Sequence, residues 1–372
     1  MSPRYAHITG WGMAVPEKIL TNADLEKMVD TEDEWIVSRT GIRQRHIATD
    51  GQTTATLAAD AALRALEVAN LLPHEVDLII VSTSSPEHIF PATACLVQDK
   101  IGAVKAGAFD LSAACTGFIY AVYLAAQAIK ANGINNALVI GSETLSRLVN
   151  WKDRDTCILF GDGAGAFVLQ ASQEPGGVLS SVLRSDGSGS DLLSVPAGGS
   201  RLPTSLQTLY DGQHYIHMNG REVFRFATRV MSQATQEAID AAHLKLDDIE
   251  LVIPHQANQR IIEAAARGLN LPMERVMVNL DRYGNTSTAS IPIATCEAIQ
   301  QDRLKPGDHV VFVAFGAGLT WGSALAQWSG PFPVERKVRP KRYRWSARLR
   351  SILRRLIRHI EGLIWGKNNI IL

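Results

Sequence analysis

The same succession of apolar segments occurs twice in this chain, and this repeat limits the folds that the chain can adopt. In each half an apolar strand is followed by a corner that opens an apolar helix, and two further apolar strands come next. Cys115 stands at this corner in the first half, and Asn285 stands at the corresponding corner in the second. The repeat predicts two similar α/β halves. The matching strands are residues 76–82, 137–141 and 163–170 in the first half, and residues 249–255, 310–315 and 322–328 in the second.

Cys115 lies between a short predicted strand at 106–111 and a predicted helix at 116–131, which Asn132 and Gly133 end. A thiol at a helix N-terminus faces unpaired backbone N–H groups and the positive end of the helix dipole, and both favour the thiolate. This is a suitable position for a nucleophile. The same sequence permits a small buried core residue, which is the commoner role of a free cysteine.

Three segments of the second half present polar groups that a nucleophile could use. His255 ends the apolar strand 251–254, Asn285 lies in a polar turn before the apolar helix 291–299, and a glycine-rich loop at 315–322 joins two strands. Glycines let the backbone approach a ligand closely. Taken singly, these features also fit a core histidine, an ordinary turn and a hairpin. Together, at strand ends of one α/β chain, they indicate a single site.

Several long motifs, in order, resemble those of the β-ketoacyl-acyl carrier protein synthase III family, the initiating condensing enzymes of type II fatty acid synthesis within the thiolase superfamily. The resemblance extends over roughly residues 1–328. The motifs are residues 21–31, 33–36, 39–43, 107–120, 160–165, 254–258, 284–287 and 314–322.

The resemblance implies an α/β fold of five layers, αβαβα, with two similar halves packed through a shared helical layer and the site at their junction. We expect an N-terminal half at 1–172 with the nucleophile, a C-terminal half at 173–330 with the histidine and asparagine, and a basic extension at 331–372. Residues 21–47 and 184–225 are polar and rich in turns, which is typical of loops at the entrance of a site.

The resemblance also implies a mechanism. Cys115 would attack an acyl-CoA thioester, and His255 and Asn285 would donate hydrogen bonds to the enolate that forms when a malonyl thioester loses CO2. The backbone N–H groups of Cys115 and Ala317 would form the oxyanion hole. A degradative thiolase would carry a second catalytic cysteine near residues 315–319, where this chain has none. Decarboxylative condensation is therefore favoured over thiolysis.

The resemblance implies that acyl-CoA is a substrate, and it implies neither a cofactor nor a metal. The resemblance places the CoA adenine between Trp35 and Arg154 and the 3′-phosphate near Thr31 and Arg39. Indole and guanidinium groups stack well on a purine, although Trp35 also fits a plain loop anchor. The other residues assigned by resemblance are Gly220, Phe224 and Asn258 in the pantetheine tunnel, Phe90 and Phe315 at the acyl pocket, and Arg225, Arg260 and Arg267 at the contact with acidic acyl carrier protein.

A homodimer is implied as well, because Phe90 resembles an aromatic residue that reaches into the acyl pocket of a partner subunit. Two of these assignments have simpler alternatives: Phe315 also fits the core, and the three arginines also fit solvated helix faces. The four cysteines lie in apolar segments without the spacing of a disulfide framework or metal site. No signal peptide precedes residue 5 and no apolar run reaches about 18 residues, so the cytoplasm is the expected location.

The C-terminal extension differs from the rest of the chain in charge. Residues 331–372 hold 12 Lys and Arg against 2 Asp and Glu, a net charge of +10, and residues 1–330 carry −10. An amphipathic cationic helix is predicted, and we expect peripheral membrane contact through residues 340–366. Docking on the acidic body or on a partner, or an unstructured tail, would fit the same pattern. The apolar positions are Leu349, Ile352, Leu353, Leu356, Ile357, Ile360, Leu363 and Ile364, and the basic ones are Arg348, Arg350, Arg354, Arg355 and Arg358.

The expected function is condensation of an acyl-CoA primer, such as acetyl-CoA, with malonyl-acyl carrier protein. One alternative is a condensing enzyme or a cysteine-dependent acyltransferase of the same fold that serves a specialised lipid or polyketide pathway. His255 and Asn285 argue against an acyltransferase that does not condense, because such an enzyme needs no enolate stabilisation. A non-catalytic scaffold held at a membrane is a further alternative, and it predicts a damaged site.

Overall fold

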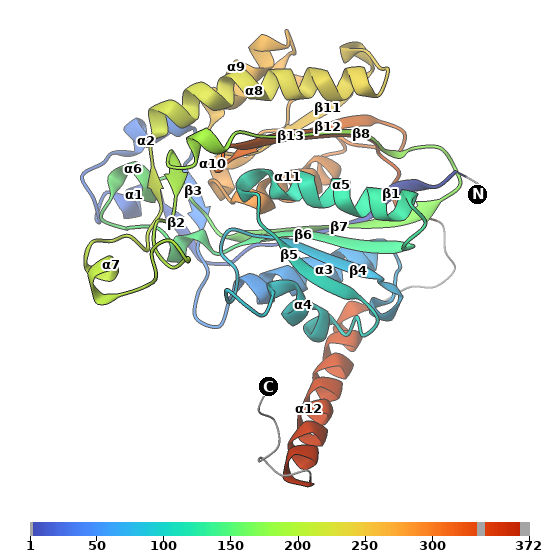
Figure 1. The fold of residues 1–372 in the computed structure, drawn as a ribbon. Helices are drawn as coiled ribbons and strands as arrows, with labels where there is room; N and C mark the ends of the chain where they lie inside the picture. Colours follow the sequence, from blue (N-terminus) through green and yellow to red (C-terminus); the bar gives the residue numbers. More distant parts are fainter. Residues whose placement is uncertain (1–2, 333–338, 365–372) are drawn as a thin grey trace.

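The computed structural model describes residues 3–332 and 339–364, which form two large sheets, two small two-stranded sheets and three layers of helices (Figure 1). Helices α3 (Thr54–Val68) and α4 (Thr93–Ile101) cover the outer face of the first sheet. Helices α5 (Gly117–Lys130) and α11 (Ser290–Gln300) lie between the two sheets. Helices α8 (Gly220–Ala241) and α9 (Gln259–Gly268) cover the second sheet. The order of layers is αβαβα, as expected.

The two sheets repeat one topology. The first has the order β1-β7-β6-β4-β5 and the second the order β8-β13-β12-β11. Each contains a parallel pair, β4 with β6 and β11 with β12, followed by two antiparallel pairs, and the first sheet has a second parallel pair, β4 with β5. The strands are β1 (Tyr5–Ala14), β4 (Leu78–Ser82), β5 (Gly107–Leu111), β6 (Asn136–Glu143), β7 (Gly163–Ser172), β8 (Gly177–Ser185), β11 (Leu251–Pro254), β12 (His309–Gly316) and β13 (Thr320–Gln327).

Every strand of the first sheet precedes residue 173, and every strand of the second follows it. The division of the chain at 172 stays a prediction, as does that at 330. Both sheets pack on α5 and α11, which carry few polar side chains because both of their faces are buried. Aromatic rings fill the space around this layer: Phe167 lies 5.0 Å from Phe118, 5.7 Å from Phe312 and 5.9 Å from Trp328 between ring centroids.

Shorter elements surround the open side of this core. The two segments expected at the entrance of a site contain α2, with Trp35 and Arg39, and the stretch from β9 to the start of α8. The remaining strands and α-helices are β2 (Ile19–Thr21), α1 (Asn22–Leu25), α2 (Asp33–Thr40), β3 (Gln44–His46), α6 (Arg154–Cys157), β9 (Leu193–Ser194), α7 (Leu206–Tyr210), β10 (His217–Met218), α10 (Leu280–Tyr283) and α12 (Pro340–Ile364).

Helix α12 extends from the α3–α4 layer into solvent (Figure 1). Within residues 3–332 and 339–364, no helix has the length and hydrophobicity needed to cross a bilayer. The same residues contain no group of three or more His, Cys, Asp or Glu side chains placed to hold a metal ion. The expected membrane segment 340–366 includes residues 365 and 366, which lie outside the described residues.

Candidate active site

The two repeated corners have the same backbone form. Cys115 lies in a short 3₁₀ turn between β5 and α5, and the residue that opens this turn, Ala114, has a φ of 47°. Asn285 precedes the 3₁₀ turn that leads into α11, and the residue that opens it, Ser287, has a φ of 48°. Left-handed backbone is uncommon for residues other than glycine and concentrates at functional sites. Each corner therefore places one candidate functional side chain at the start of a central helix, after β5 at Cys115 and after α10 at Asn285.

A strand of the opposite half closes against each corner. Gly316, the last residue of β12, lies so close to the Cys115 corner that a Cβ atom there would be 2.7 Å from the Cys115 backbone nitrogen. Gly141 of β6 lies against the Asn285 corner, where a Cβ atom would be 2.2 Å from the Thr288 carbonyl oxygen. Only glycine permits such approaches. These contacts bring the two corners together at the junction of the halves.

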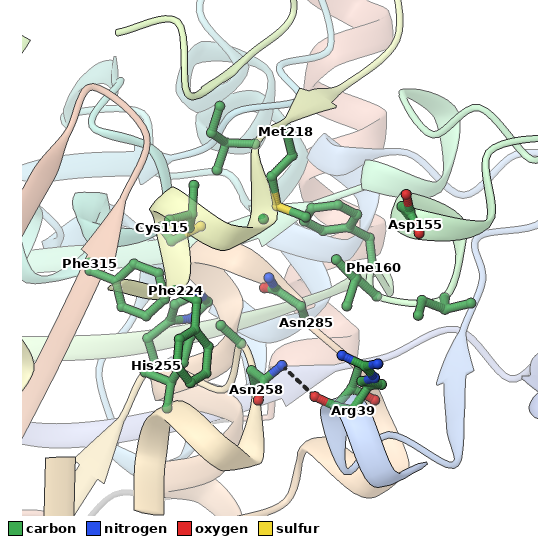
Figure 2. A pocket seen from close by; sticks show the side chains of 18 of the residues that line it. Arg39, Cys115, Asp155, Phe160, Met218, Phe224, His255, Asn258, Asn285 and Phe315 are labelled. Carbon is green, nitrogen blue, oxygen red and sulfur yellow. Dashed lines mark hydrogen bonds between the residues drawn. The ribbon is translucent and has the colours of Figure 1, made fainter. Parts of the chain in front are cut away.

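Cys115, His255 and Asn285 line one cavity of about 510 Å³ (Figure 2). Phe315 lies there too, with its ring centroid 5.5 Å from that of His255. A second cavity, of about 230 Å³, lies on another side of Cys115 and is lined by Ala317 and apolar residues such as Leu145 and Ile216. Phe315, expected at the acyl pocket, lines the larger cavity and not this smaller one.

The geometry of His255 leaves one ring nitrogen for a ligand. His255 follows β11, and its Nδ1 lies 2.7 Å from the Ser290 hydroxyl. Nε2 is buried and has no hydrogen-bond partner among the described residues. The Ser290 oxygen also accepts a hydrogen bond from the Gln256 backbone N–H at 3.4 Å, so its own proton is free to point at Nδ1. Burial lowers the pKa of His255 to about 3, which keeps the imidazole neutral.

The amide of Asn285 is oriented by a hydrogen bond within its own corner. Its Oδ1 accepts the Ser287 backbone N–H at 2.8 Å. The Asn285 backbone is fixed by the Leu159 carbonyl and by the Gly161 N–H, at 2.8 and 3.0 Å. With the oxygen engaged, the Nδ2 group is left to donate hydrogen bonds into the cavity that contains Cys115 and His255.

The pKa of the Cys115 thiol differs from the expectation that the thiolate is favoured. Burial raises its pKa to about 12, a nearby Glu143 carboxyl acts in the same direction, and the Ser287 hydroxyl acts against them. Desolvation of the anion therefore opposes the stabilisation that the start of α5 offers it. The resting form is the thiol, so a base must take its proton when the sulfur attacks.

Glu143 is a site residue that the sequence did not reveal. Its fully buried carboxyl group contacts the hydroxyls of Thr83, Ser85 and Thr288 at 3.2, 2.6 and 3.0 Å, and it accepts the Ser84 N–H at 3.1 Å. Burial raises its pKa. The group joins the ends of β4 and β6 to the Asn285 corner. The signal in the sequence that could have identified Glu143 is a carboxylic acid at the end of an apolar strand, residues 136–143. For Ser290 the sequence gave no signal beyond its place in the polar turn.

The residues expected at the CoA entrance line the outer part of the larger cavity. These are Trp35, Arg39, Gly220, Phe224 and Asn258. Asn258 begins α9, where its Oδ1 accepts the Arg260 N–H at 2.9 Å, and its Nδ2 donates to the Arg39 carbonyl at 3.0 Å (Figure 2). The guanidinium of Arg154 lies over the Trp35 ring, 4.5 Å from its centroid. A purine between them would require this guanidinium to move away from the indole.

Other predicted residues lie farther from the nucleophile. Thr31 does not line the cavity. Arg260 lies over the Phe224 ring at 5.4 Å, which places it at the entrance. Arg225 and Arg267 form exposed ion pairs with Glu222 and Glu263 on their own helices, at 3.2 and 3.9 Å. Phe90 is 84% exposed and lines neither cavity of its own chain.

Comparison with known proteins gives a consistent result. Residues 109–187 match the family described as 3-oxoacyl-[acyl-carrier-protein (ACP)] synthase III, and residues 239–328 match its C-terminal part. The chain is 54% identical over 325 residues to the beta-ketoacyl-[acyl-carrier-protein] synthase III of Roseiflexus sp. (strain RS-1), a match that covers 87% of this chain and 99% of the relative. The corresponding protein of Symbiobacterium thermophilum is 55% identical over 328 residues, or 88% of this chain and 99% of the relative.

The fold is likewise that of solved structures. The crystal structure of 3-oxoacyl-[acyl-carrier-protein] synthase III from Aquifex aeolicus VF5 matches 87% of this chain and all of that one, with a TM-score of 0.81 and 48% identity. The predicted five-layered α/β fold is confirmed.

Proposed function

The chain belongs to the 3-oxoacyl-[acyl-carrier-protein] synthase III family, and from that premise we propose that Cys115, His255 and Asn285 perform its chemistry. It is a condensing enzyme of the acyltransferase type and catalyses the condensation that initiates fatty acid synthesis. The observation that carries the assignment of residues is the unpartnered Nε2 of His255, which shares one cavity with the Cys115 thiol and the free amide of Asn285.

In the first half-reaction, the sulfur of Cys115 attacks the thioester carbon of acyl-CoA. The S–H bond breaks, the Sγ–C bond forms, and the bond from carbon to the CoA sulfur breaks. With Nδ1–H donating to the Ser290 oxygen, Nε2 presents its lone pair, accepts the thiol proton and passes it to the departing CoA sulfur. The backbone N–H groups of Cys115 and Ala317 stabilise the oxyanion, and Gly316 allows β12 to approach Cys115 closely enough for this.

In the second half-reaction, the malonyl thioester of acyl carrier protein loses CO2, and negative charge develops on its thioester oxygen. With the Ser290 hydroxyl donating to Nδ1, the imidazole carries its proton on Nε2 and donates a hydrogen bond to this oxygen beside the Asn285 amide. The enolate carbon then attacks the acyl-cysteine, the bond from the acyl carbon to Sγ breaks, and the 3-oxoacyl-carrier product forms. The released thiolate takes up one proton from the medium and becomes the free thiol. These steps need no cofactor. Because the Ser290 hydroxyl can either donate or accept a hydrogen bond, it can hold both tautomers of His255.

Residues at the outer end of the cavity are proposed to bind the substrate carriers. Trp35, Arg39 and Arg154 would hold the nucleotide end of CoA, and Gly220, Phe224 and Asn258 its pantetheine arm. The cavity opens beside α8 and α9, where Arg260 is best placed to meet acidic acyl carrier protein, with Arg225 and Arg267 further out. Thr31 does not line the cavity. It would contact the 3′-phosphate of CoA only after a rearrangement of the chain around it.

A homodimer is proposed from the surface of the first half. Strand β5 is the edge of its sheet, and its Phe109 side chain is 40% exposed. The neighbouring Ile89 and Phe90 are 85% and 84% exposed, which is unusual for large apolar side chains. Pairing of two β5 edges would cover the edge and bring Phe90 towards the partner's acyl pocket. The cytoplasm is the proposed location, and membrane contact by α12 is a separate proposal.

Intact-mass analysis tests the assignment of residues. Wild-type protein and Cys115→Ala are incubated with a panel of acyl-CoAs, and malonyl-acyl carrier protein is then added. We expect an acyl adduct on the wild type alone and its discharge as a 3-oxoacyl-carrier product. An adduct that the malonyl thioester does not discharge would favour the acyltransferase alternative. An equal adduct on Cys115→Ala would overturn the choice of nucleophile.

A further inference from the structure

Helix α12 lies beyond the part of the chain that the family matches. The family's C-terminal part ends at residue 328, and 325 of the 372 residues match nearly the whole length of the Roseiflexus relative. Activity of the condensing type therefore does not require α12. At about 1.5 Å per residue, its 25 residues reach some 37 Å.

The first turns of α12 dock on the body through the polar side of the helix. Ala347 is buried against Gly102 at the end of α4. Ser351 donates a hydrogen bond to Asp99 at 2.6 Å, and Arg344 pairs with Asp60 of α3 at 2.6 Å. These contacts lie on one side of the helix because residues three, four and seven apart share a face. The docked part fixes the direction in which the rest of α12 points.

The apolar side of α12 faces away from the body. Residues 352–362 are all exposed. At 100° per residue, the apolar residues form an arc of roughly 140°, and the docking residues lie opposite its centre. The apolar side chains are between 46% and 68% exposed, namely Trp345, Leu349, Ile352, Leu353, Leu356, Ile357 and Ile360. The helix therefore docks on acidic residues of the body through its polar side, and within one chain its apolar side stays uncovered.

The charge of α12 indicates which kind of partner could cover its apolar side. Arg348 and Arg350 lie nearest the edges of the apolar arc, and Arg354, Arg355 and Arg358 lie on the opposite side of the helix. Glu361 is the one acidic residue in its sequence. Two such helices packed face to face would bring like charges together, whereas stable helix pairs place opposite charges beside the seam. Acyl carrier protein is expected at the α8–α9 side, and α12 leaves from the opposite outer layer (Figure 1). An anionic lipid surface matches both the apolar arc and the arginines.

We propose that α12 lies in the interface of an anionic membrane through Leu349, Leu353, Leu356 and Ile360 and holds the enzyme there with its cavity entrance turned towards solution. The arginines must supply the attraction, since residues 1–330 carry a net charge of −10 and are repelled by the same surface. Carrier protein could then reach the α8–α9 side while the enzyme is bound.

Vesicle flotation with the full-length protein tests this proposal. Phosphatidylcholine vesicles are compared with vesicles that also contain phosphatidylglycerol. The apolar variant carries Leu353→Gln and Leu356→Gln, and the charge variant carries Arg354→Gln and Arg358→Gln. The control carries Leu206→Gln and Tyr210→Gln on α7, which removes exposed apolar groups of 88% and 89% exposure far from α12. Condensing activity with dissolved substrates is measured for each.

We expect the wild type and the control to float with the phosphatidylglycerol vesicles only, in a salt-dependent manner. Both α12 variants should lose at least about tenfold in binding and keep their condensing activity. Equal flotation of all four proteins would overturn the proposal. A failure of the wild type to bind the vesicles would also overturn it. Gel filtration without lipid would then show whether paired α12 helices hold an assembly that the apolar variant dissociates.

Discussion

The Cys115 and Asn285 corners have nearly the same backbone and opposite chemistry. Each is a 3₁₀ turn opened by a residue with a φ near +48°, and each leads into a helix of the central layer. Cys115 presents a thiol whose pKa is raised by burial, and in the proposed mechanism its bonds change. Asn285 presents an amide held by the Ser287 N–H, and in the proposed mechanism its bonds stay intact.

The comparison indicates how one repeated unit supplies two roles. The functional side chains come from different positions of the two corners: Cys115 follows the left-handed residue of its turn, and Asn285 lies two residues before that of the other. Each corner is also completed by a glycine from the opposite half, Gly316 for Cys115 and Gly141 for Asn285. Neither half therefore builds a working corner alone.

Removal of the thiol should give the largest effect. In Cys115→Ala, no acyl-enzyme can form, so condensation should fall by more than about 10³-fold. Release of CO2 from the malonyl thioester should remain measurable, because His255 and Asn285 are intact. Radiolabelled CO2 release and intact mass follow the two half-reactions separately. Loss of both together would mean that the two corners do not divide the chemistry as proposed.

Removal of the amide should damage the other half-reaction. In Asn285→Ala, decarboxylation should slow by about 10²-fold, as when one donor to a developing oxyanion is removed, while acylation of Cys115 stays near its normal rate. Asn285→Asp is the matched control, since it keeps the acceptor for the Ser287 N–H and lacks the donor; it should be no better than alanine. Full decarboxylation by either variant would remove Asn285 from the mechanism.

A methyl group added at Gly316 or Gly141, the glycines that pack against the two corners, should affect one corner at a time. Gly316→Ala should slow acylation, and Gly141→Ala should slow decarboxylation, each by about tenfold, because the added Cβ displaces backbone at one corner only. Both should cost about 1–3 kcal/mol of unfolding free energy. Gly187→Ala, with no atom within 4 Å of the new Cβ, is the control. Single-turnover rates and thermal melts measure the two effects.

Loss of the Ser290 hydroxyl should affect both half-reactions to a smaller degree. Ser290→Ala leaves Nδ1 of His255 without its partner, so neither tautomer is held, and each step should slow by about five- to tenfold. Ser323→Ala removes another buried hydroxyl, which donates to the Ala234 carbonyl at 2.5 Å away from the cavity. That control should lose stability without loss of rate. A slowing confined to one half-reaction would mean that His255 uses a single tautomer.

The smallest effect should appear in the pH dependence of free Cys115. Because burial raises its thiol pKa to about 12 from the ordinary 9.0, the thiolate fraction and the rate of iodoacetamide labelling should keep rising as the pH passes 9. Peptide mapping separates Cys115 from the exposed Cys95. A plateau near neutral pH would instead show that the start of α5 stabilises the thiolate more than burial opposes it.

Much of the site was predictable because apolar strands and helices mark their own ends. Cys115, His255 and Asn285 each follow or precede such a segment, and strand ends of an α/β fold converge at one edge. Glu143 and Ser290 were missed because their roles depend on distant partners in the chain, 58–60 and 145 residues away for Glu143 and 35 residues away for Ser290. Such contacts leave no periodic pattern in the sequence. The contact of Arg154 with Trp35 was likewise visible only in three dimensions.

The sequence by itself determined the repeated α/β halves, the three reactive side chains and an amphipathic cationic helix at the C-terminus, because hydrophobic periodicity and turn residues act over a few neighbouring positions. Only the tertiary structure decided the protonation of Cys115 and His255, the orientation of the Asn285 amide and the outward direction of the apolar side of α12. Burial, hydrogen-bond partners and docking faces depend on residues that are distant in the chain and meet only when it folds.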